Sequence, residues 1–139
     1  MPSRDPRETA PRPGEIEIAN PARGTVLGRR IRVADNALAR AVGLLGQTGL
    51  DPGGGLLIDP SSGIHTFGMR FAIDVVALDR GLRVRGLWEN LGPFRMAGLS
   101  WKTSCVLELP PGTIRESATE VGDVLTIRRI TYSSFTCGV

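Results

Sequence analysis

The feature that most constrains this chain is the long apolar run Ile64–Asp79, which carries the only histidine and two acidic residues. Its second half, Ile73–Leu78, is rich in β-branched residues and almost wholly apolar, a pattern typical of a strand that is buried on both faces. Asp74 interrupts this strand. Because an isolated charge is too costly to bury, its carboxylate must be hydrogen-bonded, paired or protonated. The run therefore predicts two consecutive strands, with Asp74 satisfied inside the fold.

Shorter segments predict further strands on either side of this run. Glu15–Ala19 alternates with a period of two and is followed by Asn20-Pro21, which predicts a short edge strand. Other segments alternate arginine with aliphatic residues or are brief apolar runs between turns, namely residues 25–33, 56–58, 82–88, 103–109 and 124–130. The 18 glycines and 10 prolines supply many turns between them.

Residues 36–46 carry the clearest helical pattern. Asp35-Asn36 can cap the start of this helix, its apolar residues fall on one face, and Gly46 can end it. A short helical turn is predicted around Ile114–Ala118. One helix among many short strands predicts a mainly β fold, an antiparallel sandwich or barrel-like domain with the helix of residues 36–46 packed at one end.

The length of 139 residues is that of a single domain with one hydrophobic core. Residues 1–14 hold several prolines and alternating charges, so they cannot bury enough surface to offset the entropy lost on ordering. We therefore expect a disordered arm at 1–14, a β domain at 15–130 and a loose tail at 131–139.

The basic excess is small and dispersed. The net charge is +3, and arginine pairs such as Arg29-Arg30 and Arg128-Arg129 lie within predicted strands without an aromatic stacking platform. These are features of solvated strand faces, so nucleic acid is not an expected partner. The N-terminal residues lack the apolar core of a signal peptide and no stretch is long enough to span a bilayer, which predicts a cytoplasmic protein that does not enter a membrane.

The two cysteines, Cys105 and Cys137, lie far apart and lack a C-x-x-C or histidine-flanked spacing. This spacing predicts neither a zinc site nor a thioredoxin-like motif. Free buried thiols are expected in a chain that is not secreted, with a single disulfide as the alternative. We expect no metal and no cofactor.

An ordered set of short motifs resembles a known family. The motifs are Gly-Leu-Leu at 43–45 after Arg40, Gly-Leu-Leu-Ile at 55–58, the central run, Val-Leu-Glu-Leu-Pro-Pro-Gly at 106–112, and Val-Gly-Asp at 121–123. Their order and spacing are similar to those of DUF192, a family of unknown function, over about Thr25–Ile127. The resemblance implies a small β-rich fold and no settled biochemical activity.

The central run departs from the family pattern. Many members carry F-W-M-x-N-T-x-x-P-L-D there, and Asp74 matches the final aspartate. The Trp, Asn, Thr and Pro positions are occupied here by His65, Gly68, Met69 and Ala72. A polar site built on the family's Asn-Thr pair therefore does not carry over to this chain. Many relatives also look exported, whereas this sequence shows no signal-peptide pattern.

His65, Asp74 and Glu108 are the candidate catalytic residues. Imidazole titrates near neutral pH, so His65 can serve as a general base or metal ligand, although a lone histidine is more often a hydrogen-bonded structural residue. Asp74 and Glu108 each interrupt a predicted interior strand, and two adjacent carboxylates can share a proton or act as acid and base. We favour the structural interpretation, in which one caps a turn while the other pairs with an arginine such as Arg70 or Arg40.

Aromatic residues mark a second candidate region. Trp88 and Trp101 bracket a long predicted loop, residues 90–100, that contains Phe94. If these rings face one groove they form a ligand platform, whereas as single rings they form the edge of the core. The candidate ligand-binding residues are thus His65, Arg70, Asp74, Trp88, Phe94 and Trp101.

Two functions follow from these residues. The first is a non-catalytic domain of the DUF192 type that binds a small molecule or a protein, as a monomer or weak homodimer. The alternative is an acid–base hydrolase that uses Asp74, Glu108 and His65. The hydrolase requires that these three groups converge in one pocket. The binding domain requires only an exposed aromatic or basic face.

Overall fold

The computed structural model describes residues 13–34, 49–66 and 69–129. These ranges contain the strands β1 (Glu15–Asn20), β2 (Thr25–Ala34), β3 (Gly54–Ile58), β4 (Ile64–His65), β5 (Ile73–Leu78), β6 (Val84–Leu91), β7 (Met96–Ala97), β8 (Cys105–Leu109) and β9 (Thr126–Arg129), and the short helix α2 (Thr113–Ser117). The prediction of a mainly β fold is confirmed. The helix predicted at 36–46 lies outside the described residues, as do most of the N-terminal arm and the C-terminal tail.

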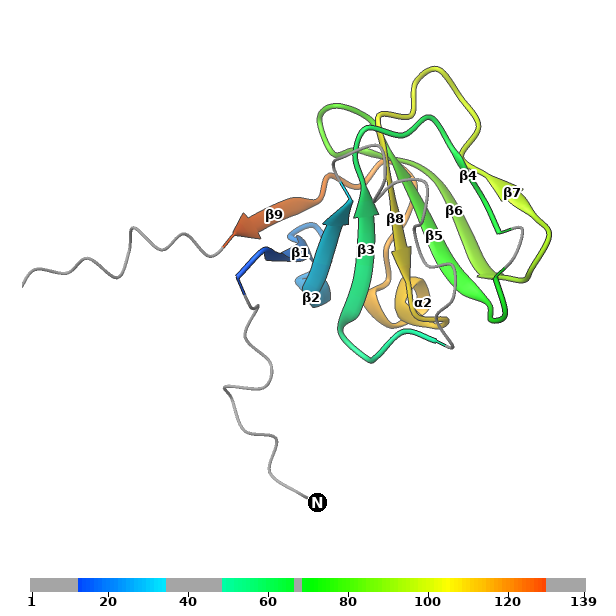
Figure 1. Ribbon diagram of the computed structural model, residues 1–139. Coiled ribbons are helices and arrows are strands. Elements are labelled where there is room, and N and C mark those ends of the chain that lie inside the picture. Colours follow the sequence, from blue (N-terminus) through cyan, green and yellow to red (C-terminus); the bar gives the residue numbers. More distant parts are fainter. Residues whose placement is uncertain (1–12, 35–48, 67–68, 130–139) are drawn as a thin grey trace, which may run out of the picture.

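Seven strands form one sheet in the order β6-β5-β8-β3-β2-β1-β9, and β4 with β7 forms a separate two-stranded ribbon (Figure 1). Of the strand pairs in the described ranges, only β2–β3 is parallel. The sheet curls until the segments that enter its two edge strands meet. There Val84 N–H donates to Asp123 O at 2.8 Å and Leu125 N–H donates to Leu82 O at 2.9 Å. The sheet is nevertheless not closed into a barrel.

Two details differ from the sequence predictions. The expectation that the first strand lies at an edge is wrong, because β9 pairs with the outer side of β1 and β9 itself is the edge. The segment predicted as the long loop 90–100 includes β7, which pairs with β4. The short helical turn near Ile114 is confirmed as α2, which begins after Gly112.

The seven-stranded sheet has an apolar core on each face. The first core includes Leu57, Val76, Leu107 and Leu109 of the central strands and Ile114 of α2. The second includes Leu56, Ile73, Val75 and Val106, covered by Ile64 and Ala97 of the β4–β7 ribbon.

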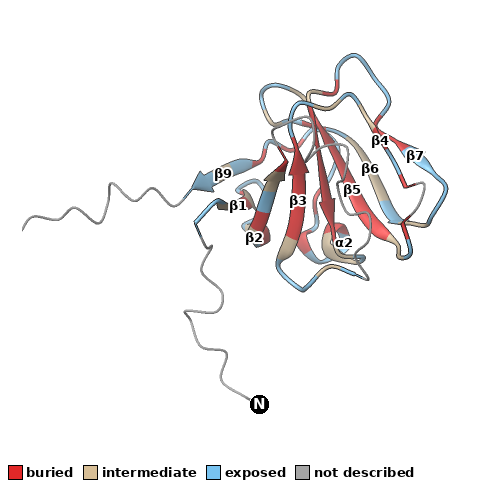
Figure 2. Cartoon of the chain, viewed as in Figure 1, coloured by how far each residue is buried: buried red, intermediate tan, exposed pale blue. Residues whose placement is uncertain are grey.

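Because helix and ribbon cover opposite faces, β3, β5 and β8 are buried on both sides, as Figure 2 shows in red. The prediction that Ile73–Leu78 is doubly buried is confirmed.

Candidate functional site

Asp74 is fully buried and its two carboxylate oxygens each accept a backbone hydrogen bond. Oδ1 accepts from the N–H of Asn90 at 2.8 Å, and Oδ2 accepts from the N–H of Ile114 at 2.9 Å. The interior carboxylate therefore has hydrogen-bond partners, as the sequence required. The carboxylate connects β5 to the end of β6 and to the first turn of α2. Both of its oxygens are therefore used in structural hydrogen bonds.

Glu108 lies on the opposite face of the sheet from Asp74. In the β5–β8 register Glu108 is opposite Val75, the residue after Asp74, and side chains alternate between faces along a strand. The two carboxylates therefore project to different sides and cannot share a proton. Glu108 is only 3% exposed, and its Oε2 has no hydrogen-bond partner among the described residues. Burial raises the pKa of this carboxyl to about 7.

His65 lies on the outer surface of the β4–β7 ribbon. It is opposite Met96 and both side chains are exposed, whereas the neighbouring pair Ile64 and Ala97 is buried against the sheet. His65, Asp74 and Glu108 thus occupy three different surroundings: the outside of the ribbon, the helix-covered face and the ribbon-covered face. The structure does not bring them together in the arrangement that the hydrolase alternative requires.

Arg70 and Trp88, two of the candidate ligand-binding residues, differ in exposure. Arg70 is exposed. Trp88 is half-buried against the second core, and its ring covers Gly86 so closely that a Cβ on Gly86 would lie 2.5 Å from the indole. Trp88 therefore belongs to the edge of the core.

Four large apolar side chains are exposed within one short segment. Phe94 is 73% exposed, Met96 53%, Leu99 62% and Trp101 88%, and we call residues 94–101 the apolar loop. Arg95 lies within it and Lys102 directly follows, with its Nζ 5.3 Å from the centre of the Trp101 ring. Phe94 and Trp101, both singled out from the sequence, therefore lie on one amphipathic segment.

A basic hollow of about 530 Å³ adjoins this loop at Trp101. Its charged lining residues are Asp79, Arg80, Arg83, Arg85 and Lys102. Partial burial raises the pKa of Asp79, but hydrogen bonds from the N–H groups of Arg83 and Gly81 and from Arg85 outweigh burial and hold that pKa below its usual value. Because Asp79 is ionised and supplies one negative charge against four positive ones, the hollow is net positive.

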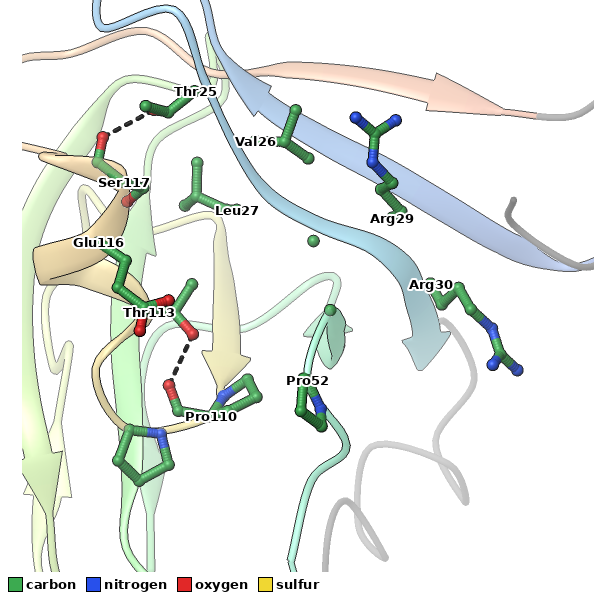
Figure 3. Close-up of a pocket in the computed structure, with 13 residues that line it drawn as sticks. Thr25, Val26, Leu27, Arg29, Arg30, Pro52, Pro110, Thr113, Glu116 and Ser117 are labelled. Atoms are coloured by element: carbon green, nitrogen blue, oxygen red, sulfur yellow. Dashed lines mark hydrogen bonds between the residues drawn. The ribbon is translucent and has the colours of Figure 1, made fainter. Parts of the chain in front are cut away.

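A larger groove of about 690 Å³ lies beside the first half of β2. It is lined by residues 25–30, Pro52, Gly53, Pro110, Pro111, Thr113, Glu116 and Ser117, and Figure 3 shows it between β2 and α2. This groove was not predicted from the sequence, although the second strand is long and the segments beside it are bounded by prolines.

No three histidine, cysteine or acidic side chains within the described ranges lie close enough to hold a metal ion. Cys105 is free and buried, and burial, together with the charges of Asp59 and Asp79, raises the pKa of its thiol to about 11. A thiol that stays protonated at neutral pH is a poor nucleophile and a poor metal ligand. No helix in the part of the chain that the structure describes could cross a membrane.

The family model of DUF192, described as an uncharacterized ACR, matches residues 18–127. The chain belongs to the DUF192 family. This confirms the resemblance seen in the sequence motifs. A comparison with curated protein sequences finds no match.

Two crystal structures resemble this DUF192 chain in fold. The first is a protein of unknown function from Novosphingobium aromaticivorans, with a TM-score of 0.66 and 20% identity over 81% of this chain and 83% of the other. The second is a protein proposed to be a transcription regulator from Sinorhizobium meliloti, with a TM-score of 0.65 and 19% identity over 81% of this chain and 91% of the other. At these identities the likeness concerns the DUF192 fold alone.

Proposed function

We propose that this DUF192 domain is a non-catalytic binding domain whose apolar loop docks onto a second protein. The observation that supports this is the exposure of Phe94, Met96, Leu99 and Trp101 within one segment. Several large apolar side chains exposed in one short segment are more than the single exposed residues usual on a soluble surface, and we take them to mark an interaction site. Aromatic residues and methionine are enriched in protein interfaces, and tryptophan is among the residues that contribute most binding energy.

The charges around the loop define the chemistry of the partner. Arg95 and Lys102 flank the exposed rings, and the net-positive basic hollow adjoins Trp101. Charge complementarity then favours a partner that offers an apolar patch bordered by aspartate and glutamate. The exposed positive charges increase the association rate with such a surface, and salt screens this attraction.

A binding role also agrees better with the separation of the polar candidates than hydrolysis does. General acid–base catalysis needs its groups within hydrogen-bond reach of one substrate. Asp74 is held by two backbone N–H groups, Glu108 projects from the other face, and His65 lies outside the ribbon. The apolar loop needs no such convergence to bind a partner.

The partner can be captured with a photo-crosslinker at the centre of the loop. Trp101 is replaced by p-benzoylphenylalanine, the cells that make the protein are irradiated, and the cross-linked protein is identified and purified. We expect Trp101→Ser to weaken its binding to the uncrosslinked domain by about tenfold or more. Raising the salt concentration from about 50 mM to about 500 mM should also weaken binding.

Val121→Ser is the matched control, because Val121 is an exposed apolar side chain outside the loop. It should leave the affinity unchanged. Equal weakening by both variants, or an affinity that does not respond to Trp101→Ser, contradicts the proposal. Cross-linking only to a second copy of this chain would assign the loop to self-association and also contradict it.

A further inference from the structure

The seven-stranded sheet has a gap beside the first half of β2. β2 has ten residues and β3 has five, and their pairing begins only at Arg30, opposite Gly54. On its other side, β2 is paired with β1 from Thr25 onward. Residues 25–28 therefore form a stretch of strand whose edge on the β3 side has no strand partner in the described structure. Such an edge can accept an added strand.

Prolines and a glycine keep this gap open. Pro52 precedes β3, and Pro110 and Pro111 follow β8; without N–H groups these residues cannot donate to an extended ladder. Gly53 O already accepts from the N–H groups of Arg29 and Arg30 at 3.0 Å each, which ends the pairing there. A Cβ on Gly28 would lie 2.9 Å from that same oxygen, so only glycine lets Gly53 approach β2 this closely at the end of the gap.

The hydroxyl groups that line the groove have hydrogen-bond partners within the fold. The hydroxyl of Thr25 donates to Ser117 O at 2.7 Å, and the hydroxyl of Thr113 donates to Pro110 O at 2.7 Å (Figure 3). These groups are therefore poorly placed to bind a small polar ligand. The unpaired edge of β2 and the exposed side chain of Val26 remain available for binding. A strand edge with an apolar side chain beside it is suited to bind an extended peptide.

We propose that this groove binds an extended peptide, which pairs with residues 25–28 of β2 as an added strand. Four residues of strand span about 13 Å. Arg29 and Arg30 lie at one end of the groove in Figure 3 and Glu116 lies on the opposite wall. Charge complementarity then favours a peptide with an acidic residue toward the arginines and a basic residue toward Glu116. This inference does not depend on the apolar loop.

The arginines already form ion pairs at the protein surface. Arg29 contacts Glu17 at 3.2 Å and Arg30 contacts Glu15 at 3.2 Å. Both arginines keep part of their side chains exposed while the glutamates are mostly covered, so an incoming carboxylate can share the arginines with these pairs. We therefore expect the charges to decide which peptide sequences bind best, while backbone hydrogen bonds to β2 supply most of the binding energy.

The test is selection of a displayed library of random octapeptides on the full chain, followed by NMR with the winning peptides. We expect amide shifts concentrated at Val26, Leu27 and Gly28. Replacing alternate peptide N–H groups by N-methyl groups should weaken binding about tenfold or more, because it removes donors of the added ladder. Glu116→Trp, which fills the groove, should also abolish binding.

Val121→Trp is the control, because it adds the same ring at an exposed position outside the groove. It should leave peptide affinity unchanged. The proposal is overturned if no selected peptide shifts the amides of residues 26–28, or if N-methylation has no effect. Peptides that shift only residues 94–101 would support the apolar loop and reject the groove, so the two proposals fail separately.

Discussion

The Oδ2 atom of Asp74 accepts a hydrogen bond from the backbone N–H of Ile114 at 2.9 Å, which connects the interior of β5 to the first turn of α2. The first N–H groups of a helix have no partner within it, and α2 has no side-chain cap at Gly112. Asp74 supplies an acceptor from a different strand and accepts the N–H of Asn90 with its other oxygen. The buried carboxylate is thus explained by the structural elements that it connects.

Replacing Asp74 by Ala should destabilise the fold by about 3 kcal/mol, because it leaves the N–H groups of Ile114 and Asn90 without their acceptor. Asp74→Asn should also destabilise, since an amide NH₂ would face one of these donors. Urea unfolding followed by circular dichroism measures both effects. Asp51→Ala is the control at an exposed aspartate. Equal unfolding midpoints for Asp74→Ala and Asp51→Ala would show that the two hydrogen bonds do not stabilise the domain.

The sequence predicted that Asp74 needs partners but not which ones. Ile114 lies 40 positions along the chain, and the contact depends on how α2 packs against the sheet. The separation of Asp74 from Glu108 likewise follows from the register of β5 with β8, which neither strand encodes alone. Strand periodicity therefore predicted local structure and burial, whereas the relation between two buried acids required the pairing.

Strand pairing also explains why the sequence did not predict the groove and why it wrongly placed β1 at an edge of the sheet. A gap beside β2 exists because β3 begins opposite Arg30, and β1 is internal because β9 returns to pair with it. Both are properties of non-local pairing. The exposure of Phe94 and Trp101 on the apolar loop was harder still to predict, because large aromatic residues usually bury most of their surface.

Gly86 should not tolerate a side chain without moving Trp88. An alanine Cβ would lie 2.5 Å from the indole, so Gly86→Ala must displace the ring from the second core. We expect a loss of about 1 kcal/mol and a red-shifted, more exposed tryptophan emission. The measurement uses a Trp101→Phe background so that Trp88 alone reports. Gly92→Ala, with open space around its Cβ, is the control, and an unchanged Trp88 spectrum in Gly86→Ala would contradict the prediction.

Asp123 should make the fold sensitive to acid. A hydrogen bond from Arg23 at 3.0 Å, then bonds from Asn20 and the N–H of Glu120, hold the pKa of this carboxyl well below its usual range. The resulting stability is present above about pH 4 and is lost as the pH falls toward the depressed pKa. Asp123→Asn should be less stable at pH 7 and should lose less stability on acidification. Parallel pH profiles of the free energy of unfolding for both proteins would contradict this.

Glu108 should have the opposite effect on the pH dependence of stability. Burial raises the pKa of this carboxyl from an ordinary value of 4.5 to about 7. Below about pH 4.5 Glu108 holds its proton in both the folded and the unfolded chain, so its contribution to the free energy of unfolding is fully present. Between about pH 4.5 and pH 7 the unfolded chain ionises first, and stability is lost by up to about 3 kcal/mol.

Glu108→Gln keeps the shape and neutrality of the protonated acid and cannot ionise. We expect the free energy of unfolding of this variant, relative to the natural chain, to increase steadily as the pH rises from about 4.5 to about 7 and then to level off. Urea titrations at a series of pH values measure the difference, which cancels the contributions of the other carboxylates. A difference that is independent of pH would show that Glu108 titrates normally and that its interior site is hydrated.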